Sequence, residues 1–279
     1  MAKANRPSLD DRPFRHYTAK HRLVAWISQN LFDNLTYTAR HGLIKGMQRK
    51  GGLAWLPEFL TGSTRTPEQA FWMNQDLRGL VIYDIGAFQG LLTLFFAGQG
   101  SQVISYEPNT RNHARLLHNL RLNGVKNVVV RKLGVGSKPE VVTMVASPLM
   151  PGGASVERDT AAGIRNSNLP VLSEQVSITT LDDDIREMSL PAPGFVKIDI
   201  EGGELAALVG ARNTLRKHKP ELFLEMHGET MNLKRKNVAN IVACLQELGY
   251  RDILHVETGT HIDGGNSAVA AEGHLYCRV

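Results

Sequence analysis

Cysteine and long apolar runs are scarce in this chain of 279 residues. Its two cysteines, Cys244 and Cys277, lie in segments with a helical and a strand pattern, so we expect buried free thiols rather than a disulfide framework. No apolar run approaches the roughly 20 residues that a membrane-spanning helix needs. The polar N-terminal segment is not followed by the apolar core of a secretory signal. These absences favour a cytoplasmic protein without a membrane span.

The chain also lacks a strong net charge outside its N-terminal region. The formal net charge is +5, but residues 1–80 hold 12 Lys and Arg against 6 Asp and Glu, and the remainder holds 20 against 21. The basic residues are scattered, and no aromatic RNA-recognition motif accompanies them. A solvated basic surface is therefore favoured, and an anionic partner such as nucleic acid is the alternative.

From Val81 onward, buried strands alternate with helices, which is typical of a parallel sheet covered on both faces. The turn at 259–267 precedes a last strand, which we expect to run antiparallel to the others. Helical spacing at 18–31, and short helices and turns at 33–61, predict a helical extension over residues 1–75, so that the α/β domain covers residues 76–279. A loop of low periodicity at 150–170 is long enough to close over a site, and a plain surface connection is the alternative.

The first distinctive motif follows the strand that starts at Val81. It has the form Asp84-x-Gly86-x-x-x-Gly90, with Glu107 at the end of the next strand. Glycine lets a ligand approach the backbone, and an acid at that position can accept hydrogen bonds from a ribose diol. The Gly-x-Gly-x-x-Gly spacing of dinucleotide-binding proteins is missing, and Asp84 would repel a pyrophosphate. The motif resembles that of class I S-adenosylmethionine-dependent methyltransferases, whose ligand carries a positive amino group.

A second polar motif follows two later strands. Asp199, Glu201 and Glu204 come after the strand near residues 195–200, and Glu225 and His227 end the strand after it. Side chains alternate along a strand, so Glu225 and His227 should project to the same side. Because ligands bind at the carboxyl edge of an α/β sheet, we expect these carboxylates and the imidazole to share one rim.

The segment Asp-Ile-Glu-Gly-Gly-Glu at 199–204, with Thr180-Leu181-Asp182 before it and Pro220-Glu221-Leu222 after it, resembles the FkbM family of methyltransferases over roughly residues 80–256. The resemblance implies a Rossmann-like α/β fold with a mostly parallel sheet of about seven strands and helices on both faces. It also implies O-methylation of a small-molecule hydroxyl, on a sugar, glycoside or other natural product. Residues 133–136 would contact adenine, and the set expected to bind S-adenosylmethionine is Asp84, Gly86, Ala87, Phe88, Gly90, Glu107 and Pro108.

An alcohol is a poor nucleophile until it loses its proton, so the acceptor needs a base. His227 is suited to that role by its ordinary pKa near 6.5, and Asp199 is the competing base. The carboxylates Asp199, Glu201 and Glu225 offer an alternative, a divalent metal that would lower the pKa of the hydroxyl. A structural role is open for Glu201 and Glu204, since a helix start favours acids.

Two other functions remain as alternatives. One is an RNA methyltransferase that binds nucleic acid through the basic N-terminal region, although the segment after Asp199 lacks the polar-Pro-Pro-aromatic pattern of many base N-methyltransferases. The other is a non-catalytic nucleoside-binding protein. The extension over residues 1–75 could form a homodimer or cover the site, and the turn with His261 and Asp263 could form a second wall.

Overall fold

The computed structural model describes residues 33–51, 66–147, 154–156 and 170–279, together with residues 23, 27, 162, 164 and 165. The helix expected at 18–31 therefore lies outside the described residues apart from two positions. Within the described part of the chain, no helix is long and apolar enough to cross a membrane.

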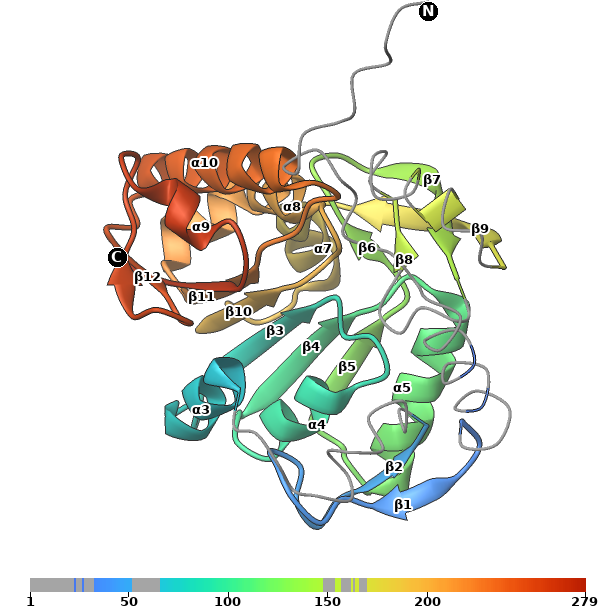
Figure 1. Ribbon diagram of the computed structural model, residues 1–279. Coiled ribbons are helices and arrows are strands. Elements are labelled where there is room, and N and C mark those ends of the chain that lie inside the picture. The colour runs from blue at the N-terminus through green and yellow to red at the C-terminus, as the bar shows by residue number, and fades with distance from the viewer. Residues whose placement is uncertain are drawn as a thin grey trace, which may run out of the picture.

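One large sheet forms the centre of the fold (Figure 1). All of its strands run parallel except β14, which is antiparallel to both β11 and β12, and the short β13, which is antiparallel to β12. This arrangement confirms the mostly parallel sheet with an antiparallel last strand. In spatial order the strands are β13 (Thr260–His261), β12 (Asp252–His255), β14 (His274–Arg278), β11 (Glu221–Glu225), β10 (Phe195–Ile198), β3 (Val81–Ile85), β4 (Gln102–Tyr106) and β5 (Val128–Arg131).

Helices cover both faces of this sheet, as Figure 1 shows. Successive side chains of a strand point to opposite faces, so Ile82 packs in the core on one side and Tyr83 and Ile85 pack in the core on the other. Both faces are therefore apolar and need cover. One layer contains α3 (Pro67–Asn74), α4 (Leu91–Ala97) and α5 (Thr110–Leu122), and the other contains α7 (Leu181–Met188), α8 (Glu204–Gly210), α9 (Arg212–His218) and α10 (Met231–Leu248).

Two short helices follow β10 in place of one long helix, because the chain turns between α8 and α9 at Ala211. Gly210 lies so close to the backbone of Gly136 that a Cβ there would overlap it. The start of α9 is held by Asp182, whose carboxylate accepts hydrogen bonds from two backbone N–H groups of α9 at 2.8 and 2.9 Å. Thr180 caps α7, so the Thr180-Leu181-Asp182 segment fixes two helix starts.

A second, four-stranded sheet lies beside the carboxyl ends of β4 and β5, and the sequence reading did not predict it. Its strands, in spatial order, are β6 (Gly134–Val135), β9 (Leu172–Thr179), β7 (Glu140–Ala146) and β8 (Ala154–Ser155). Strand β8 falls within the segment expected to be a loop at 150–170, most of which lies outside the described residues.

The described part of the N-terminal region also differs from expectation. Residues 33–51 contain an antiparallel pair, β1 (Thr36–Thr38) and β2 (Gln48–Lys50), where short helices and turns were expected. Asn119 of α5 and Asn123, the C-cap of that helix, accept hydrogen bonds from the backbone N–H groups of Lys50 and Gln48, both at 2.8 Å. The ribbon therefore packs along α5 on the main domain. A boundary near residue 75 remains a proposal.

Candidate active site

The two motifs meet where β3 and β10 end side by side. Gly86 follows β3 with a φ of +83°, and a Cβ at this position would overlap the backbone oxygen of Asp199, which follows β10. Only glycine allows this approach. The backbone therefore brings the first motif into direct contact with the second.

Glu107 lies on the β4 side of this junction and is buried. Its two carboxylate oxygens accept hydrogen bonds from the backbone N–H groups of Phe88, at 2.8 Å, and Asn109, at 2.9 Å. Burial raises the pKa of Glu107 to about 8, although the two N–H donors act in the opposite direction. Phe88 has a φ of +50°, a conformation that is uncommon outside glycine and that turns its N–H toward Glu107. The carboxylate is thus fixed at the edge of the site.

Asp84 lies inside the protein and does not line the pocket. The Thr93 hydroxyl donates to its carboxylate at 2.5 Å, and its other oxygen lies 3.5 Å from the Lys197 ammonium. In the β3–β10 register, Asp84 is directly opposite Lys197. A direct contact of Asp84 with a ligand, as the sequence suggested, does not agree with this placement.

Lys197 was missed by the sequence reading. It is almost fully buried, and its ammonium donates to the carbonyl oxygen of Gly86 at 2.9 Å and pairs with Asp199 at 3.0 Å. Burial alone would lower the pKa of Lys197, but the negative charges of Asp199 and Asp84 raise it above its ordinary value. A lysine in an otherwise apolar strand, two residues before an acid, is the signal that identifies it.

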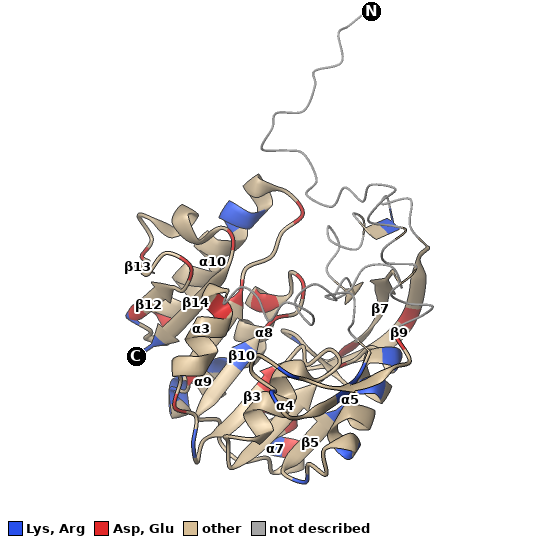
Figure 2. Ribbon diagram, turned by 60° about the horizontal axis from the view of Figure 1, so that its bottom comes forward, with Lys and Arg blue, Asp and Glu red and all other residues tan. Residues whose placement is uncertain are grey.

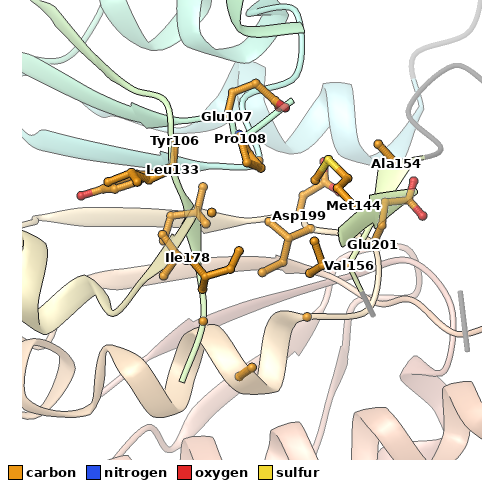
Figure 3. A pocket seen from close by; sticks show the side chains of 18 of the residues that line it. Tyr106, Glu107, Pro108, Leu133, Met144, Ala154, Val156, Ile178, Asp199 and Glu201 are labelled. Atoms are coloured by element: carbon orange, nitrogen blue, oxygen red, sulfur yellow. The ribbon is translucent and has the colours of Figure 1, made fainter. Parts of the chain in front are cut away.

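A cavity of about 410 Å³ opens at this edge of the sheet and is shown in Figure 3. Glu107 and Pro108 line it from the end of β4, and Asp199 and Glu201 line it from beyond the end of β10. Of the set expected to bind the cofactor, Gly86, Phe88, Glu107 and Pro108 line the cavity, as do residues 133–136. Asp84, Ala87 and Gly90 do not.

Gly90 instead serves helix packing. It has a φ of +87°, and a Cβ there would overlap the side chain of Leu116 on α5. The four-stranded sheet provides a further wall of the cavity that the sequence reading missed, apart from the expectation that segment 150–170 approaches the site. This wall consists of the side chains of Val142, Met144, Ala154, Val156 and Ile178.

His227 also lines the cavity, and three carboxylates surround its Nε2 atom. The distances are 3.5 Å to Glu225 Oε1, 3.8 Å to Asp199 Oδ1 and 3.9 Å to Glu201 Oε2. Its other ring nitrogen, Nδ1, lies 2.9 Å from Glu204 Oε1. The sequence prediction that these side chains share one rim is therefore met by the geometry. Figure 2 shows acidic segments beside α8 and a basic segment on β10.

At this rim, burial and the neighbouring charges shift the pKa values of His227 and Asp199 in opposite directions. Burial alone would lower the pKa of His227, but the hydrogen bond and charge of Glu204, with Glu201 and Asp199 nearby, raise it to about 10. Burial acts to raise the pKa of Asp199, yet Lys197 and His227 lower it below its ordinary value. At neutral pH His227 is therefore charged, which does not fit the general base expected from the sequence, whereas Asp199 is ionised and can accept a proton.

Three of these residues offer donor atoms that lie within 4.8 Å of one another, namely Asp199, Glu225 and His227. The sequence reading placed Glu201 in this group and His227 outside it. Glu201 instead has a φ of +55° in the turn before α8. On the far side of Glu225, its Oε2 atom lies 3.7 Å from His274, which in turn contacts Glu257 at 2.6 Å.

The turn expected as a second wall is not part of the cavity. His261 lies in β13, and its Nδ1 is 3.0 Å from an Asp252 carboxylate oxygen. Asp263 accepts hydrogen bonds from the backbone N–H groups of Gly265 and Asn266 within its own turn. These two residues therefore stabilise the turn before η4 (Ser267–Ala270).

The sheet order and the cavity at the carboxyl ends of its strands define a class I methyltransferase with a Rossmann-like fold. Residues 84–251 match the model of the methyltransferase FkbM domain. The chain belongs to the FkbM family of S-adenosylmethionine-dependent methyltransferases. No curated protein sequence matches it.

Several solved structures are similar in fold. FkbM methyltransferase from Methylobacillus flagellatus is 23% identical, with a TM-score of 0.49, over 81% of this chain and 51% of that one. The chain thus spans about half the length of that protein. A TehB-like SAM-dependent methyltransferase from Corynebacterium glutamicum is 12% identical, with a TM-score of 0.43, over 80% and 91% of the two chains. Aeropyrum pernix fibrillarin, with S-adenosyl-L-methionine bound, is 11% identical, with a TM-score of 0.40, over 73% and 68%.

Proposed function

We propose that this chain transfers a methyl group from S-adenosylmethionine to a hydroxyl oxygen of a small molecule, on a sugar, glycoside or other natural product. The observation that carries the proposal is that one cavity is lined both by Glu107, suited to a ribose diol, and by the polar rim of Asp199 and His227. Donor and acceptor can therefore meet in one enclosed space.

The residues at the β3 and β4 ends fit a nucleoside ligand. Glu107 presents a fixed carboxylate to the cavity, and each of its oxygens can accept a further hydrogen bond from a ribose hydroxyl. The absent Cβ of Gly86 keeps the backbone accessible, and Pro108 with residues 133–136 offers an apolar surface for a base. When bound, S-adenosylmethionine supplies a methyl group on a positively charged sulfur. Asp84 supports this end indirectly through Lys197.

The residues at the β10 and β11 ends fit a hydroxyl acceptor. Asp199 and Glu225 line the cavity and can accept the proton that the hydroxyl loses. Lys197 and Glu204 fix the orientations of Asp199 and His227. The apolar side chains of Val142, Met144 and the neighbouring strands exclude water from the same space. Such a mixture of apolar walls and few polar groups is typical of small-molecule sites.

The test has two parts. Calorimetric titration with S-adenosylhomocysteine should show saturable binding to the folded chain, and failure of a well-folded sample to bind would disprove the cofactor assignment. A panel of sugars and hydroxylated natural products, read by mass spectrometry for a gain of one methyl group, then identifies the acceptor. Methylation confined to nitrogen atoms or to RNA would disprove the assignment of oxygen on a small molecule.

A further inference from the structure

Three donor atoms converge at the rim of the cavity from two neighbouring strand ends. Asp199 follows β10, and Glu225 ends β11, with His227 two residues later. Because β10 and β11 are parallel neighbours, their carboxyl ends meet, and the three donor atoms lie within 4.8 Å of one another. All three residues line the cavity, so a ligand bound there would touch the acceptor.

The separations at this rim are those of metal ligands rather than of hydrogen-bonded groups. Nε2 of His227 is 3.5 Å from Glu225 Oε1 and 3.8 Å from Asp199 Oδ1. Hydrogen bonds between such atoms span about 2.7–3.2 Å. Two ligands of a divalent cation, with bonds of about 2.0–2.3 Å at angles of about 90–120°, lie about 3–4 Å apart.

In each of the three residues, the polar atom that would not bind the cation contacts another side chain. Glu204 holds Nδ1 of His227 at 2.9 Å and itself accepts from the backbone N–H groups of Ile200 and Gly202. Lys197 pairs with Oδ2 of Asp199. A carboxylate behind a histidine fixes the ring so that its far nitrogen faces an ion, which is the usual arrangement around metal-bound imidazoles.

A neighbouring side chain also contacts the second carboxylate oxygen of Glu225. His274 lies 3.7 Å from its Oε2 atom, on the side away from His227. Three separate groups therefore contact the other polar atoms of these residues, and Oδ1 of Asp199 and Oε1 of Glu225 both lie within 3.8 Å of Nε2 of His227. Two carboxylates and one imidazole suit Mn²⁺ and similar ions better than Ca²⁺ or Mg²⁺, which prefer all-oxygen ligands.

We propose that Asp199, Glu225 and His227 bind one divalent cation, with Glu204 as the positioning residue for His227, and that this cation takes the acceptor's hydroxyl oxygen as a further ligand. The role toward the acceptor rests on the proposed function, whereas binding of the cation does not. A hydroxyl bound to a divalent cation loses its proton more readily. Asp199 and Glu225 then serve as ligands of the cation rather than as the base, and the proton leaves to solvent through the opening of the cavity.

The experiment is a titration of the metal-stripped full-length chain with Mn²⁺, followed by electron paramagnetic resonance, in which bound Mn²⁺ loses the sharp solution signal. We expect saturation at one Mn²⁺ per chain. The variants Asp199→Asn and His227→Gln should abolish the site, and Glu204→Gln should weaken it about 10–100-fold. Glu221→Gln is the matched control, because Glu221 lies at the opposite end of β11 and accepts a hydrogen bond from the Tyr276 hydroxyl. The affinity of this variant for Mn²⁺ should equal that of the unaltered chain.

Circular dichroism and S-adenosylhomocysteine calorimetry on the same samples separate the possible failures. If the folded chain binds S-adenosylhomocysteine but shows no saturable Mn²⁺ binding, the metal site is disproved and the proposed function stands. Binding that persists in Asp199→Asn and His227→Gln also overturns the assignment. If Mn²⁺ binds at the site but the nucleoside does not, the proposed function fails and the metal site stands. If His227→Gln does not fold, the loss of Mn²⁺ affinity in Glu204→Gln and Asp199→Asn tests the site instead.

Discussion

The ammonium group of Lys197 lies 3.0 Å from the carboxylate of Asp199, and both belong to the edge where β10 ends. The same ammonium donates to the carbonyl oxygen of Gly86 and lies 3.5 Å from Asp84. One buried cation thus joins the ends of β3 and β10 and neutralises charge from both motifs. It connects the region assigned to the donor with the region assigned to the acceptor.

Replacing Lys197 with methionine should destabilise the fold strongly. The change keeps the length of the side chain but leaves the Asp84 and Asp199 carboxylates without their cation. Breaking a buried pair in this way costs about 3–5 kcal/mol in the free energy of unfolding. Urea denaturation measures it, and Lys217→Met on the exposed surface of α9 is the control, expected within about 0.5 kcal/mol of the original. Equal urea midpoints for Lys197→Met and Lys217→Met would contradict a stabilising role for the buried Lys197 ion pairs.

The affinity for S-adenosylhomocysteine should depend on the protonation of Glu107. Its pKa is raised to about 8, mainly by burial, so the group is largely protonated near pH 7 and ionised by pH 9. A carboxylate accepts hydrogen bonds from both ribose hydroxyls, so affinity should rise as pH increases from 6.5 to 9. Calorimetry at several pH values measures this rise.

The variant Glu107→Gln removes the titrating group and keeps the shape. At pH 9, where Glu107 is ionised, the affinity of this variant should be lower than that of the original chain by about 1.5–3 kcal/mol, the value of hydrogen bonds to a charged group. Its affinity should stay flat between pH 6.5 and 9. A rise of equal size in Glu107→Gln would assign the pH dependence to another group.

Alanine at position 86 should destabilise the protein more than alanine at position 124. Both glycines have positive φ, at +83° and +61°, so each substitution bears the cost of a left-handed conformation, about 1–2 kcal/mol. A Cβ at Gly124 meets no atom within 4 Å, whereas one at Gly86 overlaps the backbone of Asp199. We expect Gly86→Ala to lose a further 1–3 kcal/mol, roughly the cost of overpacking, in urea denaturation. A difference near zero would show that β3 and β10 can separate without cost.

Removing the Asp182 side chain should weaken the start of α9 without affecting ligand binding. Its carboxylate accepts from the N–H groups of Asn213 and Thr214, and loss of such a cap costs about 0.5–2 kcal/mol. Thermal unfolding of Asp182→Ala measures the loss, with exposed Glu187→Ala as the control. Calorimetry with S-adenosylhomocysteine should give the original affinity, and a large change there would contradict a purely structural role.

Sequence spacing was enough to predict the central sheet and to bring Glu107, Asp199 and His227 to one edge, because strand ends follow directly from the buried runs before them. The role of Asp84 was not predictable in this way. Its side chain meets Lys197 only because β3 and β10 pair in one register, which no local pattern reveals. The approach of His227 to Asp199 and Glu225 was likewise not predictable, because it depends on how the segments after β10 and β11 turn at the edge of the sheet.

The four-stranded sheet was missed for a different reason. Strand β9 alternates polar residues with Val176 and Ile178, which is a strand signal, but it follows a long segment without periodicity. Strands β6 and β8 have two residues each and are formed by pairing with neighbours rather than by local preference. Strand β6 pairs with β9, which is distant in sequence, and β8 pairs with the nearby end of β7. Neither short strand carries a pattern of its own, so only the folded chain defines them.

The contact between Gly86 and the backbone of Asp199 has a consequence for how such a protein can diversify. The backbones of β3 and β10 meet there without an intervening side chain, so a segment carrying the first motif can be exchanged between relatives only if it brings a glycine and the same strand spacing. Val142, Met144 and Val156 also line the cavity, and none of them takes part in the junction of β3 and β10. We expect acceptor preference to diverge through these side chains, while the junction of β3 and β10 remains fixed.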